Sequence, residues 1–579
     1  MSLLTALFLA KLINGAIIKS SVIIIDKGQI QVFKINHKFT LLIVWLLMMV
    51  IYLPGGESSS LRDDSANKAQ AMSKGKIVFI PHDDRPTSGE QTAAVVRKLG
   101  YEVAMPDKSL LGSLNKTGDT DSLWQWLRVN AKDAKAAVIA TDSLIYGGLV
   151  NSRKHEMPIE MLKAKEAELR TLHEYYPEMK LYAFGSLMRT PKSGEASGGE
   201  DPAYYINYGS QIFRYTALMD KAEMTGLNDS ENAECMQIES EVPAEILQDW
   251  FERRQNNLAI TMAMVDDVRR GAIDYLLIGK DDNAPLSETH RESRWLSDYA
   301  HGVPSDRFRL VAGIDEFAML LLSRAINDVE HQQPKVYTEF NAGKGGATIP
   351  AYSDEKLADT LKVELAVAGA VAVPDPAMAD YVLLVNTPAD GITGEANHIR
   401  SGEGALLNDG KDRAETAYIL DRINKYLAAG YKVGIADVAF TNGSDNALMN
   451  HLQSEGLLFR LRAYSGWNTA TNSLGFALGQ GILAARLSQA DCNDLLKTRY
   501  LDDWLYQANV RTAMGHKIEQ MADPSVYLYL GSHEQNIAEE TAQGIEAMAK
   551  EKLPLEEQPA DIKVAFPWHR MFIADIEAK

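Results

Sequence analysis

KIVFIPHDDRP, residues 76–86, places a short apolar run directly before a cluster of charged residues. The same arrangement recurs at AAVIA (136–140), which TDSLIYGG follows, and at YLLI (275–278), which GKDDNAP follows. Short, continuous apolar runs are typical of strands that are buried on both faces of a parallel sheet. This pattern decides the fold class, because it predicts an α/β protein.

Amphipathic stretches with helical spacing separate the apolar runs, for example at residues 89–99, 162–175 and 316–326. Alternating strands and helices predict βαβ units and therefore parallel sheets. The remaining strands are expected at residues 181–184, 309–313, 335–340, 371–373, 381–386, 432–437 and 459–464. Helices are expected between the later strands at residues 353–368, 413–429, 445–455 and 472–485.

We predict two doubly wound parallel-sheet domains, at residues 76–330 and 331–486. A helical insertion is expected at about 190–270, because that stretch has few strand signals. Residues 487–579 are expected to form a helical C-terminal region to about residue 550 and a tail with a short strand at 562–566. A distorted (β/α) barrel that uses strands from both series is the alternative architecture.

Residues 1–75 are interpreted as a signal or anchor segment followed by a linker, because residues 41–53 read LLIVWLLMMVIYL without interruption. A run of 13 residues is short for a membrane span, which needs roughly 20, and suits the apolar region of a signal peptide. We therefore expect an exported, extracytoplasmic protein, periplasmic or secreted. Cleavage of the segment and anchoring by residues 41–53 both remain open, and contact with the membrane is expected only there.

The formal net charge of -19 argues against a nucleic-acid partner, because neutralising phosphates requires clustered Lys and Arg. Cys235 and Cys492 are the only cysteines, and neither has the spacing of a zinc or iron–sulfur ligand. No nucleotide-binding loop motif is present either, so no cofactor is recognised. A divalent metal remains open, because carboxylates from different strands can bind one.

Two adjacent pairs of carboxylates follow apolar runs, Asp83–Asp84 and Asp281–Asp282. Ligands of open α/β sheets bind outside the carboxyl ends of the strands. Crowded like charges raise the pKa of one carboxyl group, which can make it a general acid near neutral pH. We therefore predict Asp281, Asp282 and Asp84 as catalytic residues. For any single Asp in such a place, a helix N-cap is the competing structural explanation.

Substrate-binding side chains are expected at the same strand ends. Arg85 offers a planar fork of donors that suits a carboxylate or a phosphate, although a salt bridge to Asp83 or Asp84 is the competing role. In YSGWNTATN (464–472), aromatic faces and amides suit a polyhydroxylated ring, although a Gly turn with a helix cap also explains this stretch. The candidates are Arg85, Asp142, Tyr146, Arg189, His290, Asp315, Glu316, Trp467 and Asn468. We expect Asp84, Asp142, Asp281, Asp282 and Asn468 to line one cleft.

Six segments together resemble a bacterial protein family of unknown function. These are PHDDRP, TDSLIYGGLVNSR, KDDNAP, GIDEFAMLLLSR, AYSGWNTATNSLG and the terminal FPWHR. The resemblance extends from about Lys76 to the C-terminus. It implies the extent of the folded region and brings no established activity with it.

The pattern of residues favours a glycosidase-like hydrolase that acts on a carbohydrate or a cell-wall fragment outside the cytoplasm. Asp281 and Asp282 would be the acid/base and orienting carboxylates, with Trp467, Asn468 and Tyr146 shaping the sugar site. The expected partner is therefore a small molecule or carbohydrate. The alternative function is a non-catalytic solute-binding protein with a cleft between two α/β domains.

Overall fold

The computed structural model describes residues 21–26, 29–34, 73–194, 198–397, 406–521 and 523–579. The chain divides into two units, residues 1–71 and 72–579. In the first unit, strands β1 (Ser21–Asp26) and β2 (Gln29–Lys34) pair antiparallel. The apolar run 41–53 lies outside the described residues. None of the helices that are described is long and apolar enough to cross a membrane.

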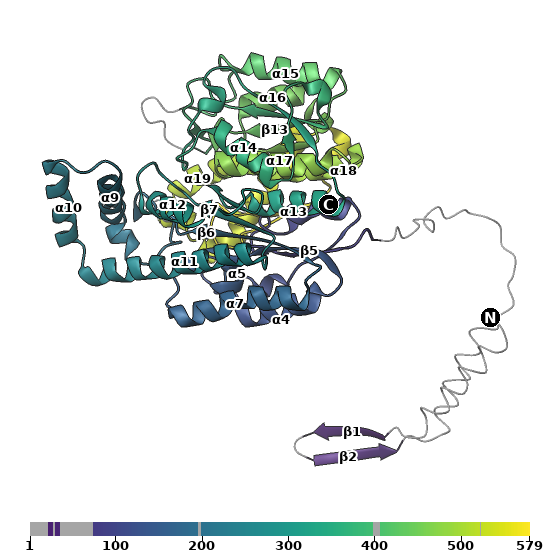
Figure 1. Ribbon diagram of the computed structural model, residues 1–579. Helices are drawn as coiled ribbons and strands as arrows, with labels where there is room; N and C mark the ends of the chain where they lie inside the picture. Colours follow the sequence, from purple (N-terminus) through teal and green to yellow (C-terminus); the bar gives the residue numbers. More distant parts are fainter. Residues whose placement is uncertain (1–20, 27–28, 35–72, 195–197, 398–405, 522) are drawn as a thin grey trace. The chain divides into compact units, whose positions relative to one another are not determined.

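Two open parallel sheets organise the second unit (Figure 1). The first has six strands in the order β4-β3-β5-β6-β7-β8, and the second has five in the order β10-β9-β11-β13-β15. Neither sheet closes on itself, so the predicted open α/β fold is confirmed and the barrel alternative is wrong. The strands are β3 (Lys76–Ile80), β4 (Glu102–Ala104), β5 (Ala134–Ala140), β6 (Lys180–Leu187), β7 (Tyr275–Lys280), β8 (Phe308–Ala312), β9 (Lys335–Phe340), β10 (Val371–Ala372), β11 (Tyr381–Asn386), β13 (Val433–Asp437) and β15 (Ala463–Ser465).

Each sheet is doubly wound, because its first strand lies between its second and its third. The strands of the first sheet all precede residue 331, and those of the second all follow it. Two strands of the second sheet differ from the prediction. The strand expected at 459–464 starts only at Ala463, after a short 3-10 turn at Leu458–Arg460. The run at 371–373 forms a strand of two residues.

A layer of helices lies between the two sheets and packs against both of them (Figure 1). One buried core joins Phe79 of β3, Phe317 of α13, Leu474 of α17 and Leu383 of β11. The middle layer consists of α3 (Glu90–Lys98), α13 (Phe317–Val329), α14 (Leu357–Val367) and α17 (Ala470–Ala484). Because residues of a strand alternate between its two faces, the outer face of each sheet buries a separate core.

Other helices cover these outer faces. The outer face of the first sheet packs against α4 (Thr120–Ala131), α7 (Ile159–Tyr175), α11 (Ala244–Arg270) and α12 (Glu288–Tyr299). The outer face of the second packs against α15 (Thr416–Ala428), α16 (Asn446–Ser454), the π-helix Tyr500–Val510, α19 (Arg511–Glu519) and α20 (Glu534–Lys552).

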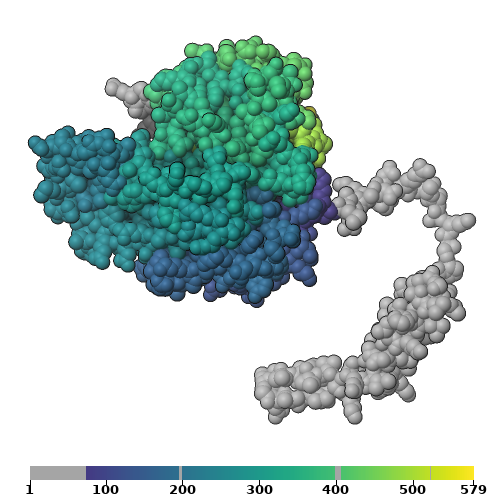
Figure 2. Space-filling view, viewed as in Figure 1, coloured from purple at the N-terminus to yellow at the C-terminus, as the bar shows by residue number. Residues whose placement is uncertain are grey.

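The helical insertion expected at about 190–270 contains α9 (Tyr205–Met224), α10 (Asp229–Glu241) and α11. Figure 2 shows α9 and α10 as a projection from the body formed by the two sheets. The sequence did not suggest α10, because Ile238 is its only buried residue and its apolar periodicity is therefore weak. An Asn228 capping box begins this helix. The predicted helical C-terminal region also contains a hairpin, β16 (Ile562–Ala565) and β17 (Asp575–Ala578).

Tyr381 fixes the position of α17 against the second sheet. Its ring lies between Gly434 of β13 and Gly481 of α17, and its hydroxyl donates to the carbonyl oxygen of Ala477 at 3.0 Å. A Cβ atom at Gly481 would lie 2.1 Å from the Tyr381 hydroxyl oxygen, which is closer than atoms can pack. This contact matters for function because the residues just before α17 reach the candidate site.

We predict that Gly481→Ala destabilises the protein by about 1–3 kcal/mol, because the added methyl group overpacks the core. In a Tyr381→Leu background the same change should cost little or should stabilise, because Ala favours a helix over Gly by about 1 kcal/mol. Denaturant unfolding of the four proteins of this cycle measures the difference. An equal cost in both backgrounds would contradict the proposed steric contact.

A chain that begins at Ser73 should fold cooperatively, because the strands and cores of the second unit all lie within residues 72–579. Thermal unfolding of this shortened chain should show one sharp transition with native-like circular dichroism. Aggregation, or a broad transition, would indicate that the apolar run 41–53 belongs to the core.

Candidate functional site

A pocket of about 240 Å³ lies where loops at the carboxyl ends of both sheets meet. The first sheet contributes the segments after β3, β5, β6, β7 and β8, and the second contributes the segments after β9, β13 and β15. The pocket is lined by Arg85, Leu149, Arg153, Arg189, Glu200, Asp281, Asp282, Gly313, Ile314, Asp315, Tyr352, Asn442, Asn468, Thr469, Thr471, Asn472, Tyr527, Leu528, Arg570 and Phe572. Open α/β sheets usually bind their ligands outside the carboxyl ends of the strands, where this pocket lies.

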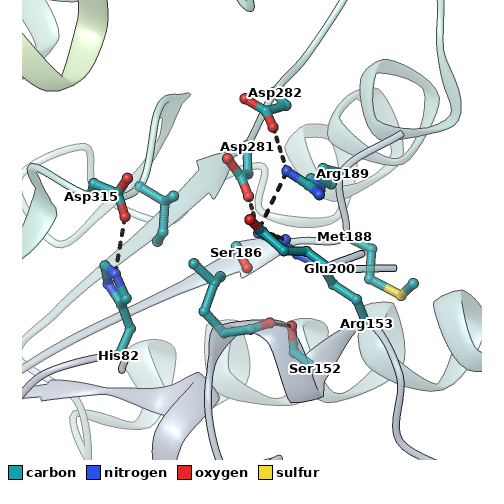
Figure 3. Close-up of polar contacts among 12 residues, drawn as sticks. His82, Ser152, Arg153, Ser186, Met188, Arg189, Glu200, Asp281, Asp282 and Asp315 are labelled. Carbon is teal, nitrogen blue, oxygen red and sulfur yellow. Dashed lines mark hydrogen bonds and ion pairs between the residues drawn. The ribbon is translucent and has the colours of Figure 1, made fainter. Parts of the chain in front are cut away.

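The pair Asp281–Asp282 follows β7 and forms part of the pocket wall (Figure 3). Neighbouring residues of a regular strand point to opposite faces. Asp282 departs from that geometry with a φ of 40°, in the left-handed region that non-glycine residues seldom adopt. The turn brings both carboxyl groups to the pocket. Asp281 then pairs with Arg153, and Asp282 pairs with Arg189 at 2.7 Å.

Burial and the nearby charge of Asp282 together raise the pKa of Asp281 to about 7, against the opposing effect of Arg153 and Arg189. Asp281 is therefore partly protonated near neutral pH and can donate a proton. Asp282 differs from it in its partner, the guanidinium group of Arg189. Two adjacent carboxyl groups in different environments are the usual requirement for separate acid and base roles.

Glu200 lies between three arginines on one side of the pocket (Figure 3 labels two of them). Its carboxylate accepts from Arg153 Nη1 at 2.9 Å, pairs with Arg189 Nη1 at 3.5 Å, and pairs with Arg570. Burial alone would raise the pKa of Glu200, but Arg189, Arg570 and Arg153 together hold it well below its ordinary value.

Arg85 and Asp315 form a second ion pair at the pocket. Arg85 Nη2 donates to Asp315 Oδ1 at 2.6 Å, and Asn468 Nδ2 donates to Asp315 Oδ2 at 2.7 Å. Burial opposes ionisation of Asp315, yet Arg85 and His82 hold its pKa below the ordinary range. The guanidinium of Arg85 stacks on Trp568 and Trp467, with 4.9 and 5.8 Å to the ring centroids. The two indole rings therefore pack against the guanidinium group of Arg85 and restrict its position.

Backbone strain concentrates at this pocket. Seven non-glycine residues of the described chain have a left-handed φ, and four of them line the pocket: Asp282, Tyr352, Asn442 and Asn468. Their φ angles are 40°, 64°, 61° and 59°. Each such residue costs of order 1–3 kcal/mol and persists only where its surroundings impose it, most often at functional sites. The strain supports a functional role for the pocket independently of its charges.

Six of the twelve predicted site residues line the pocket, namely Arg85, Arg189, Asp281, Asp282, Asp315 and Asn468. Two more lie at the same strand ends without lining it. Asp84 accepts from Trp568 Nε1 at 2.8 Å, and burial raises its pKa to about 6. Asp142 accepts from Ser186 Oγ at 2.9 Å, and burial raises its pKa to about 6 as well. The expectation of one shared cleft therefore holds for Asp281, Asp282 and Asn468 but not for Asp84 and Asp142.

The remaining four have other surroundings. Tyr146 stacks on His155 with ring centroids 5.0 Å apart and lines a separate pocket. His290 lies 2.6 Å from Asp220 of α9. Trp467 packs in the small core under Arg85, and Glu316 is buried next to Asp315. Burial raises the pKa of Glu316 well above its ordinary value.

Several pocket residues were not anticipated from the sequence: Arg153, Glu200, Tyr352 and Arg570. Arg153 and Arg570 end two of the distinctive segments, TDSLIYGGLVNSR and FPWHR, so a signal for both was present. Glu200 lies in a Gly/Ser-rich stretch that reads as a loop, and nothing in its surroundings predicts three arginine partners.

The geometry of the carboxylates bears on the question of a metal ion. Among the residues that the structure describes, no group of three or more His, Cys, Asp or Glu side chains is placed to hold one. The acidic residues of the pocket are instead paired with arginines.

The fold and the pocket define an α/β protein with a strained, charge-paired site at the edges of two parallel sheets. A model for the family of proteins of unknown function DUF4127 matches residues 77–577, and the chain belongs to this family. The resemblance noted from the six sequence segments is thereby confirmed. No curated protein and no solved structure matches the chain.

The raised pKa of Asp281 predicts a specific dependence of stability on pH. The protonated group contributes stability that is fully present below about pH 4 and is lost as the pH rises through about 7. Asn cannot ionise, so the stability of Asp281→Asn relative to the wild type should increase from pH 4 to pH 8, by about 2–4 kcal/mol. Urea unfolding at several pH values measures this difference.

Asp142→Asn provides a matched comparison, because Asp142 has a raised pKa of about 6. Its stability difference should level off at a lower pH than that of Asp281→Asn. A difference for Asp281→Asn that does not change with pH would show that Asp281 is fully ionised in the folded protein.

Proposed function

We propose that the protein is an acid/base hydrolase that acts on a carbohydrate-like, polyhydroxylated substrate. The observation that carries this proposal is the pair Asp281–Asp282. One of its carboxyl groups has a pKa of about 7, the other is paired with an arginine, and a strained backbone turns both toward one pocket. Perturbed carboxyl groups in a cleft are the usual mark of acid/base chemistry.

In the proposed reaction, Asp281 donates its proton to the leaving-group oxygen as the bond to that oxygen breaks. Asp282 orients the attacking water and accepts a proton from it, and its ion pair with Arg189 keeps the carboxylate in position. Release of the proton from Asp282 to solvent and return of a proton from solvent to Asp281 complete the cycle. General acid/base catalysis of this kind typically contributes a factor of about 10²–10⁴ to the rate.

The pocket lining supports a polar, hydroxyl-rich substrate. Thr469, Thr471, Asn442, Asn468 and Asn472 add neutral hydrogen-bonding groups to the charged ones. The amide oxygen of Asn472 is buried and has no hydrogen-bond partner among the described residues. A substrate hydroxyl can donate to that oxygen, since a buried polar atom without a partner costs about 1–3 kcal/mol. The volume of about 240 Å³ suits one small ring or group.

The alternative, a solute-binding protein that closes about a hinge, has less support. Such proteins need two bodies that can separate. Here α13 and α17 pack against each other and share one buried core with both sheets. Opening the sheets would expose that core, so a rigid site is the more consistent arrangement.

We further propose that the protein acts outside the cytoplasm, periplasmic or secreted. The support for this is the apolar run at residues 41–53 with basic residues before it and Pro54 and small residues after it. A soluble or cell-wall-derived carbohydrate would be accessible there. Mass spectrometry of the N-terminus of the mature protein would distinguish cleavage from anchoring.

Asp281→Asn and Asp282→Asn should each reduce turnover by a factor of about 10² or more, because each removes a proton-transfer group. Turnover of the wild type should also fall as the pH rises above about 7, where Asp281 loses its proton. A screen of labelled sugars and cell-wall fragments, with and without divalent metal, supplies the substrate for these rate measurements.

The matched control is Asp142→Asn, which neutralises a buried strand-end carboxyl group that does not line the pocket. It should retain most of the activity per folded molecule. Full specific activity in a folded Asp281→Asn variant would contradict the proposed role of Asp281. Binding of a sugar without any turnover would favour the solute-binding alternative.

A further inference from the structure

Three buried arginines converge on the single carboxylate of Glu200, and we call Arg153, Arg189 and Arg570 the arginine triad. They come from distant parts of the chain: the end of α6 (Leu149–Ser152), the segment after β6, and the segment between β16 and β17. Their exposed fractions are 2%, 6% and 6%. Buried guanidinium groups need anionic partners, and Glu200 is the carboxylate that all three share.

The residue that occupies the triad belongs to a glycine-rich turn. Gly198 and Gly199 precede Glu200 with left-handed φ angles of 57° and 77°. The backbone oxygens of these glycines accept from Arg570 and from Lys154. The side chain of Glu200 therefore supplies the main ion pairs that hold this turn at the pocket. No atom of the other described residues lies within 4 Å of the Cβ position of Gly199.

We propose that the arginine triad is the binding site for an anionic group of the substrate, and that Glu200 occupies this site in the free protein. The inference rests on the proposed function and narrows it to an acidic carbohydrate. The group is a carboxylate, a phosphate or a sulfate. Guanidinium forks match the planar or tetrahedral oxygens of all three.

The position of the triad connects it to the reacting groups. Arg153 contacts both Glu200 and Asp281, and Arg189 contacts both Glu200 and Asp282. An anionic group in place of the Glu200 carboxylate would thus lie next to the acid pair. The triad would hold the anionic end of the substrate while Asp281 donates its proton to the leaving-group oxygen at the other end.

The local charges permit this exchange. Among the residues that the structure describes, the other carboxyl groups that pair with the triad are Asp201, Asp281 and Asp282, and the raised pKa of Asp281 reduces its negative charge near neutral pH. Lys154 adds a further positive charge close enough to interact with the same cluster. In addition, Arg570 Nε is buried and has no hydrogen-bond partner in the described part of the chain. An incoming oxygen atom can accept from it.

Glu200 competes with any external anion because it belongs to the same chain. The apparent dissociation constant for an anion equals the intrinsic constant divided by the fraction of molecules in which Glu200 has left the triad. Replacing Glu200 by a neutral residue of the same shape removes this competition and leaves the arginines in place. Binding of anions should then become tighter, because the carboxylate that competes for the arginines has been removed.

The test uses the full chain and isothermal titration with inorganic phosphate, glucuronate and glucose. Glu200→Gln should bind phosphate or glucuronate at least 10-fold more tightly than the wild type, and glucose without any such gain. Adding Arg570→Gln to Glu200→Gln should remove the gain. Glu90→Gln removes an exposed carboxylate that pairs with Arg97, and this control should bind as the wild type does.

The anion that gains affinity identifies the source of the group: glucuronate indicates a sugar carboxylate, and phosphate alone indicates a phosphorylated sugar. Glu200→Asp withdraws the carboxylate by one methylene group and should give an intermediate gain, which keeps the test available if Glu200→Gln is unstable. Folded Glu200→Gln and Glu200→Asp that bind neither anion more tightly than the wild type would overturn the proposal. Titration does not depend on turnover, so this result is distinguishable from failure of the proposed hydrolase activity.

Discussion

The packing of α13 against α17 is the contact on which the arrangement of this protein depends. These helices bury one face of each sheet in a common core, and the Tyr381 ring fixes α17 by packing between Gly434 of β13 and Gly481 of α17. Two doubly wound sheets would ordinarily present two separate sets of strand ends. With the middle layer shared, loops from both sets reach one pocket. The fold thereby combines Asp281 from the first sheet with Asn468 from the second.

Burial of charge then imposes a second condition on the pocket. A guanidinium or carboxylate that is removed from water must be paired, and removal of one partner is far more costly than the pair is stabilising. The pairs Arg85–Asp315 and Arg153–Asp281 each join segments that are distant in the sequence. The strained φ of Asp282 persists because such pairs hold the side chains from several directions. Rigid positioning of this kind is what acid/base chemistry requires.

The sequence was sufficient for the open α/β fold and for the strand ends that carry Arg85, Asp281 and Asn468, because apolar runs followed by polar residues are local patterns. It was insufficient for Glu200, whose role depends on arginines up to 370 positions away. Asp142, in contrast, was predicted to line the cleft but does not line the pocket. It ends a strand in the same way as Asp281, but its side chain turns to Ser186 instead of the pocket. Tertiary packing sets the direction in which a loop turns, and the positions of polar residues along the sequence do not predict it.

The charge of the whole protein explains why recognition at this site would act only at short range. A net charge of -19 repels an anionic ligand in solution, and salt screens that repulsion beyond about 8–10 Å. Inside the pocket, the low dielectric strengthens each contact between an arginine and an oxygen. An acidic protein can therefore bind an acidic sugar if its cations are buried and preorganised, as in the arginine triad. Long-range attraction would then contribute nothing to the rate of association, and selectivity would come from the fit of the anion between the three guanidinium groups.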